Sequence, residues 1–332
     1  MDSLDQQVVR KVKQWLDAGE TCWICTIVET FGSSPRPVGS LLACDEQGEI
    51  IGSLSGGCVE DDLIDRLRFG TLDTSKPHIE EYGLSAEENE RLGLPCGGRL
   101  GVMVEKVEPS SESLTHVNEI LEALDSRRCI QRVVDLKTGD YSLKSVDRFM
   151  ALELSETQMV QTFGPRFLML LIGAGQLSVS LAEIAKMMDY RVLVCDPRPQ
   201  MVEHWPLPDV ECVQMMPDDV VRERAGDPYS IIITLTHDPR IDDMALMEAL
   251  TTEAFYVGAL GSDRTTANRL PRLKDLDLTD DQIGRLHAPV GLKLGSKTPP
   301  EIAIAILAEI TQIRAAHRKQ VAAGETSQCV NA

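Results

Sequence analysis

Apolar and polar positions in the second half of the chain predict strands that alternate with helices. The segment FLMLLIGAGQLSVSLAEIAKMM (167–188) contains an apolar run, a glycine turn and a stretch of helical periodicity. RVLVCD (191–196) resembles a second strand, and three short apolar runs follow at 210–215, 229–235 and 254–258. Because this alternation produces a parallel sheet with right-handed crossovers, we predict a Rossmann-like, doubly wound parallel sheet.

The first half of the chain has the pattern of a mixed α+β domain. Apolar residues recur at helical spacing from Leu4 to Leu16, and TCWICTIVET (21–30) is rich in strand-forming residues. A loop at 31–40, two strands around a turn at 41–54 and a helix after Gly57 follow. Residues 110–162 predict a helix and then strands.

These patterns divide the chain into an N-terminal domain (1–162), a Rossmann-like domain (163–318) and a mobile polar tail (319–332). The last long helix has a sharp start signal at TPPE (298–301). There Thr298 can cap the helix, the following proline needs no amide partner, and Glu301 can close a capping box.

Charge and composition narrow the classes of partner. The chain has 332 residues and a formal net charge of −19, so nucleic acid and anionic membranes are poor partners. No apolar run approaches the roughly 18–20 residues that span a bilayer. The start MDSLDQQ lacks the apolar core of a signal peptide, and nine scattered cysteines do not form a disulfide framework. We therefore expect a cytoplasmic protein with free thiols.

The turn Gly173-Ala174-Gly175 follows a strand and opens a helix, as a dinucleotide-binding fingerprint requires. The first glycine permits the tight turn, the second lets a phosphate approach, and the helix start at Gln176 offers unpaired amides. Asp196 lies where an acid can bind a ribose hydroxyl. Ser178 replaces the third glycine, however, so NAD(P) binding stays open.

Other polar loops should lie at the same carboxyl edge of the sheet, where doubly wound sheets bind ligands. They contain His237, a candidate donor or base, and Gly258 and Gly261, whose alternative role is turn geometry. Arg198 can accept a ribose phosphate or be solvated, and His287 can equally be a structural hydrogen-bonding group.

The stretch SLSGGCVE (53–60) places a thiol where a strand turns into a helix. Thiolates are favoured at helix N-termini, and Gly56 and Gly57 leave Cys58 accessible. Cys96, in PCGGR, also adjoins a glycine pair. Two such thiols suit a soft metal or sulfur transfer, although a buried structural cysteine remains the alternative. Neither belongs to a zinc-type cysteine pair.

Two further features qualify this site. Cys22 and Cys25 have C-x-x-C spacing, but strand alternation points them to opposite faces, which argues against a redox pair. Three acidic residues, Glu60 to Asp62, crowd the first turn of the helix after Cys58. Their carboxylates would repel a phosphate unless the side chains point away from it. We therefore expect the thiol, rather than the helix N-terminus, to bind a ligand there.

Together these motifs resemble the XdhC/CoxI family, accessory proteins of xanthine dehydrogenase and related molybdenum hydroxylases. The matching segments, in chain order, are GSSPRPVGS, GSLSGGCVEDDL, CGG, LLIGAGQLS, YVGALGSDRT and HAPVGLKLGSKTPPEIAIAILAEI. They span both domains, whereas residues 110–162 match no motif of this family. The resemblance implies an XdhC/CoxI-type N-terminal domain followed by a Rossmann-like domain.

The resemblance also implies a function. Family members bind and protect the molybdenum cofactor, support replacement of an oxo ligand by sulfur from a cysteine desulfurase, and insert the cofactor into the hydroxylase, often as homodimers. The cofactor is molybdopterin or its dinucleotide form. The residues expected to contact it are Gly56, Gly57, Cys58, Cys96, Gly173, Gly175, Gln176, Asp196, His237, Gly258 and Gly261. Of these, Cys58 and Cys96 are the candidate molybdenum contacts.

We therefore expect a maturation chaperone rather than an enzyme. One alternative is an NAD(P)-dependent oxidoreductase that uses the same Rossmann-like pocket. Another is a structural adaptor between hydroxylase and desulfurase.

Overall fold

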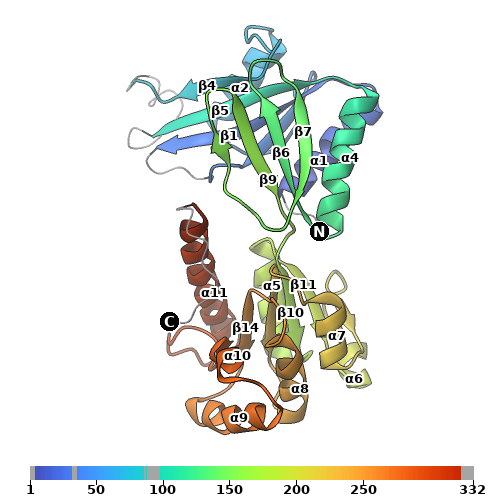
Figure 1. Ribbon diagram of the computed structural model, residues 1–332, viewed down its shortest axis with the longest axis vertical. Coiled ribbons are helices and arrows are strands. Elements are labelled where there is room, and N and C mark those ends of the chain that lie inside the picture. The colour runs from blue at the N-terminus through green and yellow to red at the C-terminus, as the bar shows by residue number, and fades with distance from the viewer. Residues whose placement is uncertain (1–3, 32–35, 86, 88–97, 323–332) are drawn as a thin grey trace. The chain divides into compact units, whose positions relative to one another are not determined.

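The computed structural model describes residues 4–31, 36–85, 87 and 98–322 and contains two compact units (Figure 1). The first unit is Met1–Pro165 and the second is Arg166–Ala332. Each unit carries its own core, because every buried apolar cluster contains residues of one unit alone. The break after Pro165 lies close to the boundary at residue 162 drawn from the sequence.

The N-terminal unit is an α+β fold with two antiparallel sheets. One sheet has the order β3-β2-β1-β5-β4 and the other has the order β7-β6-β9-β8. The described elements are α1 (Leu4–Asp17), β1 (Cys22–Phe31), β2 (Leu41–Asp45), β3 (Ile50–Gly52), α2 (Cys58–Arg68), β4 (His78–Tyr82), β5 (Arg99–Val107), α4 (Ser111–Asp125), β6 (Cys129–Asp135), β7 (Tyr141–Val146), β8 (Glu153–Leu154) and β9 (Gln158–Phe163). This confirms the helix and strands expected between residues 110 and 162.

Strand β1 is apolar on both faces because helices cover both faces of its sheet. Cys25 belongs to the core that includes Val59 and Leu63 of α2. Cys22 belongs to the opposite core, with Val12 of α1 and residues of α4. The two cysteines therefore point to opposite faces, as the alternation predicts.

A buried ion pair joins the two sheets of this unit. Arg132 on β6 donates from Nη1 and Nη2 to the two carboxylate oxygens of Glu105 on β5, at 2.9 and 2.7 Å. Both side chains are about one-twentieth exposed. The remaining donor, Arg132 Nε, contacts His116 Nε2 at 2.9 Å. Burial, followed by the neighbouring Arg132 charge, lowers the pKa of His116 to about 3, so this ring is a neutral acceptor.

The C-terminal unit is a doubly wound sheet of parallel strands. Its strand order is β12-β11-β10-β13-β14-β15, which is 3-2-1-4-5-6 in the unit's own order. The elements are β10 (Leu168–Ile172), α5 (Gln176–Met187), β11 (Arg191–Cys195), α6 (Pro199–Glu203), β12 (Glu211–Val213), α7 (Pro217–Arg224), β13 (Ser230–Thr234), α8 (Pro239–Ala249), β14 (Tyr256–Ala259), α9 (Asp263–Asp275), α10 (Asp280–Gly284), β15 (Leu286–His287) and α11 (Pro299–Ala322). The strand order reverses between β10 and β13, which is where such sheets bind ligands.

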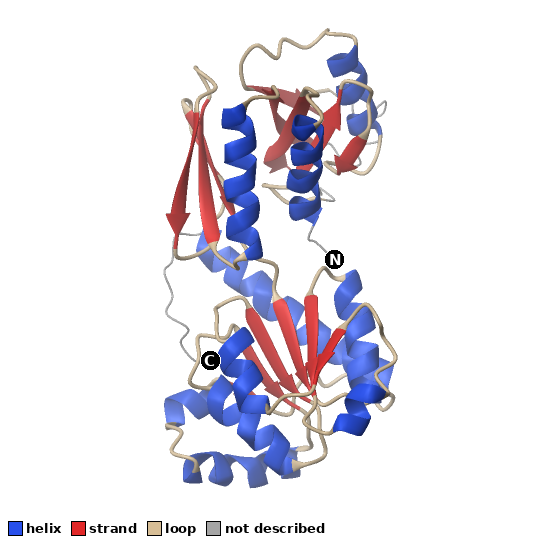
Figure 2. Cartoon of the chain, turned by 90° about the vertical axis from the view of Figure 1, so that its right-hand side faces the viewer, coloured by secondary structure: helices blue, strands red, loops and turns tan. Residues whose placement is uncertain are grey.

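Helices cover both faces of this sheet (Figure 2). Helices α5 and α11 contribute to one core cluster, and α7, α8 and α9 contribute to the other. The start of α11 follows the expected capping signal, because Glu301 Oε2 accepts from the Thr298 amide at 3.0 Å. No helix in the ranges that the structure describes is long and apolar enough to cross a membrane.

Two features of this unit differ from what the sequence pattern predicts. Strand β15 was missed, because a two-residue strand has no periodicity of its own and exists by pairing with β14. Helix α11 continues to Ala322, four residues into the segment expected to be a mobile tail, because no glycine or proline interrupts it before Gly324. Residues 323–332 lie outside the described residues.

We expect Arg132→Leu to lower the free energy of unfolding of the N-terminal unit by about 3–5 kcal/mol, because it leaves Glu105 buried without its partner. Arg128→Leu is the matched control, since Arg128 is half exposed and its ion pair with Glu122 is a surface contact. Urea unfolding followed by tryptophan fluorescence in a Trp205→Phe background reports on this unit, where Trp15 and Trp23 lie. Equal effects of the two leucine variants would contradict the assigned role of the buried pair.

Candidate functional site

Cys58 is the first residue of α2, and its side chain is exposed. Gly56 precedes it with φ of +80°, a conformation that favours glycine. Gly57 is the N-cap, and a Cβ atom on either glycine would meet nothing within 4 Å. The thiol therefore lies on an open turn at a helix N-terminus, as the sequence predicts.

The carboxylate of Glu60 organises this turn. Glu60 Oε1 accepts from the backbone amides of Leu54, Ser55 and Gly56 at 3.0, 2.8 and 2.7 Å, and Oε2 accepts from the Gly57 amide at 3.2 Å. The hydroxyl groups of the two serines at 53 and 55 also donate to this carboxylate. The amides of residues 54–57, just before α2, are thus occupied by the chain's own carboxylate.

The surroundings of Glu60 favour its ionised form. Burial acts to raise its pKa, but hydrogen bonds from Ser55, Gly56 and Gly57 outweigh burial and lower the pKa to about 2. The sequence predicts that Glu60 is one of several charges that repel a phosphate, but its side chain turns back into the loop. The expectation that the thiol, rather than the helix end, attracts a ligand stays a prediction.

Exposure separates Cys58 from the other cysteines that the structure describes. Cys22, Cys25, Cys44, Cys129 and Cys195 are buried, and Cys212 is half-buried. Burial is the main cause that raises the pKa of Cys22, Cys44 and Cys195 to about 12 and that of Cys212 to about 11. These thiols stay protonated, whereas Cys58 is open to reagents. Cys96 lies outside the described residues.

In the glycine turn after β10, Gly173 is required by the backbone conformation and packing, whereas the space beside Gly175 is unoccupied. Gly173 has φ of +107°, and a Cβ atom there would lie 2.7 Å from Thr236 Cγ2. A Cβ atom on Gly175, the N-cap of α5, would meet nothing within 4 Å. Gln176 is exposed at the first helical position. The space above the helix start is therefore open to a phosphate group.

Asp196, at the end of β11, is fully buried and already holds several donors. It accepts from the Ala174 amide at 2.9 Å, the Arg198 amide at 3.0 Å, and Arg198 Nε and Nη2 at 2.8 and 2.7 Å. Burial acts to raise the pKa of Asp196, but these hydrogen bonds outweigh it and the pKa is lowered. Ser178 is buried and donates to the Gly173 carbonyl. Asp196 thus stabilises the glycine turn through the Ala174 amide. Binding of a ribose hydroxyl by Asp196 stays a prediction.

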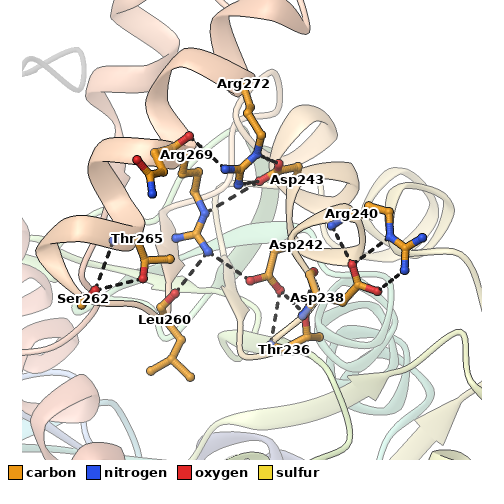
Figure 3. A network of polar contacts seen from close by, with 11 residues as sticks. Thr236, Asp238, Arg240, Asp242, Asp243, Leu260, Ser262, Thr265, Arg269 and Arg272 are labelled. Atoms are coloured by element: carbon orange, nitrogen blue, oxygen red, sulfur yellow. Dashed lines mark hydrogen bonds and ion pairs between the residues drawn. The ribbon is translucent and has the colours of Figure 1, made fainter.

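A buried polar network links the loops after β13 and β14 (Figure 3). Asp242 on α8 accepts from Thr236 Oγ1 at 2.7 Å and from Arg269 Nη2 at 3.1 Å. Arg269 also donates to the Leu260 carbonyl at 3.2 Å. Burial raises the pKa of Asp242 to about 6, although Thr236 and Arg269 act in the opposite direction. Because Thr236 also contacts Gly173, the network reaches the glycine turn.

The remaining candidates occupy different places. His237 is exposed after β13, and Gly261 is half-buried between β14 and α9. Gly258 was expected in a loop, but it lies inside β14, where a Cβ atom would be 2.7 Å from Val290 Cγ2. Its lack of a side chain is thus explained by packing. Cys58 belongs to the N-terminal unit, and the other candidates named here belong to the C-terminal unit.

His287 has a structural environment. Its Nδ1 lies 2.9 Å from Glu309 Oε1, and its ring stacks on Tyr256 with centroids 4.4 Å apart. The Tyr256 hydroxyl and the Gly291 amide donate to the other oxygen of Glu309. This agrees with the alternative that His287 is a structural hydrogen-bonding group.

Two family models match the chain in the order of its two units. The XdhC and CoxI family matches residues 15–83, and the XdhC Rossmann domain matches residues 169–310. The chain belongs to the XdhC and CoxI family. The Cys58 turn lies in the first matched segment, and the glycine turn and the Arg269 network lie in the second.

Relatives of this XdhC/CoxI protein match over most of their length. A protein of Bacillus subtilis (strain 168) that is named as a probable xanthine dehydrogenase subunit is 26% identical over an alignment 324 residues long, which covers 90% of this chain and 95% of the relative. The molybdenum cofactor insertion chaperone PaoD of Escherichia coli (strain K12) is 23% identical over an alignment 316 residues long, which covers 92% of this chain and 88% of the relative. A crystal structure described as a xanthine dehydrogenase from Bacillus halodurans, 24% identical, has a TM-score of 0.74 and covers 96% of this chain and 98% of its own. That structure shows the shared fold.

Thr236, Asp242 and Arg269 are not among the residues that the sequence motifs predict for a site. Asp242 lies on the buried face of α8, with Leu246 one turn later, and Arg269 precedes the buried Leu273 on α9. A charged residue at a core position of each of two helices could have revealed this pair in the sequence, because charged residues are rarely buried unless they are paired.

We expect Glu60→Gln to destabilise the N-terminal unit at neutral pH. The folded pKa of Glu60, about 2, lies below its ordinary value of 4.5, so the ionised form stabilises the fold above pH 4.5. This contribution, roughly 3 kcal/mol, should vanish as the pH falls from about 4.5 towards 2. Urea unfolding against pH measures it, and Asp61→Asn, at an exposed acid of the same helical turn, is the control. A stability difference from the parent protein that does not change with pH would exclude this origin.

We expect Gly173→Ala and Gly175→Ala to differ in thermal unfolding. The first change forces a side chain into positive φ and against Thr236, at a cost on the order of 1–3 kcal/mol. The second places a methyl group in open space at ordinary φ and should leave the melting temperature within about 2 °C. Equal decreases in the melting temperature of the two variants would show that the space beside Gly175 is not open in solution.

Proposed function

We propose that this protein binds the molybdenum cofactor and delivers it to a xanthine dehydrogenase-type molybdenum hydroxylase. The observation that carries the proposal is that both family domains occur in order, with an exposed cysteine on the SGGC turn of the first. A relative named as a molybdenum cofactor insertion chaperone aligns with 92% of the chain. The name of the Bacillus subtilis relative supports the class of recipient enzyme.

Cys58 supplies the thiol of this proposal. Molybdenum in this cofactor is held by sulfur donors, and a thiolate is a soft ligand that suits such a metal. In the part of the chain that the structure describes, no group of three or more histidine, cysteine or acidic residues forms a metal cage. In this proposal the cofactor is cargo, held by its organic part and by the Cys58 thiol, with Cys96 as the second candidate contact. The same thiol can carry sulfur received from a cysteine desulfurase.

The open turn at Gly175 supplies the phosphate site. The pterin carries a phosphate, or a nucleotide in the dinucleotide form, and the first amides of α5 have no acceptor within the helix. The absence of a side chain at Gly175 lets a phosphate oxygen approach these amides. In this role the Rossmann-like unit cradles a phosphate and performs no redox step.

The partners and setting in this proposal are a molybdenum hydroxylase, a cysteine desulfurase and a second copy of the chain, in the cytoplasm. The alternative function, NAD(P)-dependent oxidation, uses Asp196 for the ribose. The carboxylate of Asp196 already accepts hydrogen bonds from Arg198 and Ala174, so this alternative needs those contacts to break.

The test is to purify the protein from cells that synthesise the cofactor and to measure bound molybdenum and the fluorescence of oxidised pterin. Activation of the apo-hydroxylase is measured in parallel. We expect Cys58→Ala to reduce metal retention or activation at least about tenfold, because one soft ligand is lost. Cys212→Ala is the control, since Cys212 is half-buried on β12 with its pKa raised by burial.

Three outcomes decide the matter. Loss of activation in Cys58→Ala with retained pterin supports the thiol role and a separate phosphate site. Full cofactor retention and activation in Cys58→Ala would refute the thiol role. Absence of molybdenum and pterin from the parent protein, together with NAD(H) binding and turnover, would replace the proposal with the oxidoreductase.

A further inference from the structure

Arg269 is a buried cation with open hydrogen-bond donors. Its side chain is 3% exposed, and only Nη2 has hydrogen-bond acceptors, Asp242 and the Leu260 carbonyl. Nε lies 3.8 Å from Asp243 Oδ1, beyond hydrogen-bond distance. Within the described residues, neither Nε nor Nη1 has a hydrogen-bond partner. Leaving a charged donor buried and unpaired is costly, so an acceptor is expected to complete it.

The open Nη1 donor faces the turn between β14 and α9. A Cβ atom on Gly261 would lie 3.8 Å from Nη1 and 3.1 Å from Thr265 Cβ and Cγ2, so only a glycine lets the turn pass this close to the guanidinium and to Thr265. Figure 3 shows the guanidinium nitrogen without a dashed line directed towards Thr265. Thr265 is itself exposed, and a ligand that reaches Nη1 has to displace its side chain.

The same turn starts α9, a helix of 13 residues. Its N-cap, Ser262, accepts from the Thr265 amide at 3.1 Å, and the hydroxyl groups of Ser262 and Thr265 lie 2.9 Å apart. The first amides of a helix have no intrahelical acceptor and lie at the positive end of the helix dipole. Two hydroxyl groups and these amides thus belong to the turn that includes Gly261 and borders the Arg269 guanidinium.

We propose that the Gly261–Thr265 turn and Arg269 form an oxyanion site that binds a phosphate group. A guanidinium binds phosphate oxygens through charge-assisted hydrogen bonds, and the helix start and hydroxyl groups complete the set of donors. The charge of Arg269 remains fixed by Asp242, while Arg272 neutralises Asp243 at 2.6 Å. The nearby Asp263 carboxylate is exposed and lies 3.9 Å from Lys293.

This site is separate from the glycine turn at Gly175 but borders the same edge of the sheet. Strands β10, β13 and β14 are neighbours, so the two turns are two strand spacings apart, roughly 10 Å. The proposed site does not require the molybdenum cofactor, because any phosphate-bearing ligand supplies the same oxygens. Its failure would therefore leave the cofactor-delivery proposal standing, since that proposal is tested by bound molybdenum and pterin.

The test is a titration of the full chain with inorganic phosphate, followed by amide chemical shifts and calorimetry. We expect saturable shifts at residues 261–265, distinct from any shifts at 173–176. Arg269→Lys keeps a charge beside Asp242 but lacks Nη1, and we expect phosphate affinity at this turn to fall about tenfold to hundredfold. Gly261→Ala adds a methyl group beside Nη1 and against Thr265 without removing the ion pair, and we expect a similar loss.

Arg272→Lys is the matched control, because Arg272 belongs to the same network but pairs with Asp243. Its phosphate affinity should stay within about twofold of the parent protein. Circular dichroism and melting temperature check that each variant is folded, and Gly261→Ala keeps the test decisive if Arg269→Lys does not fold. Saturable shifts at 261–265 that persist unchanged in both variants, or no shifts there at millimolar phosphate, would overturn the proposal. A nucleoside monophosphate titrated in parallel distinguishes free phosphate from a nucleotide as the preferred source.

Discussion

Buried backbone amides at turns need acceptors, and in this protein the chain's own carboxylates supply many of them. Glu60 accepts from the amides before α2, Asp196 from the amide of Ala174, and Asp242 from the amide of Thr236. Glu309 and Glu301 do the same for the turns at Gly291 and Thr298. Part of the acidic composition is therefore structural, and several turns that look suited to anions are already filled.

This constraint determines which groups remain for a ligand. At the turn before α2 the amides are occupied, so the exposed Cys58 thiol is the group presented outward. At the turn after β10 Asp196 takes the Ala174 amide, while the side of Gly175 stays open. A glycine turn in a Rossmann-like fold thus need not bind a dinucleotide, because the acid that would read the ribose serves the turn itself.

Much of the fold follows from periodicity. Long apolar runs and helical stretches predict the alternating order of the C-terminal unit, and strand alternation predicts the opposite faces of Cys22 and Cys25. The sequence could not reveal β15, whose two residues become a strand by pairing with β14. It also could not distinguish Gly258, which is required by packing, from Gly175, which is open. That distinction depends on neighbours distant in sequence.

The sequence also does not reveal which buried charges pair with each other. Asp242 and Arg269 are 27 residues apart and come into contact because α8 packs against α9. Their contact has a consequence for the edge of the sheet. Thr236 touches both Gly173 and Asp242, and Arg269 holds the Leu260 carbonyl, so three loops share one set of contacts. Separating Arg269 from Asp242 would leave two unpaired charges in the interior, which is energetically costly. A displacement of one loop therefore strains the other two. The geometry of this edge of the sheet is thus set by buried groups beneath it as much as by the residues exposed there.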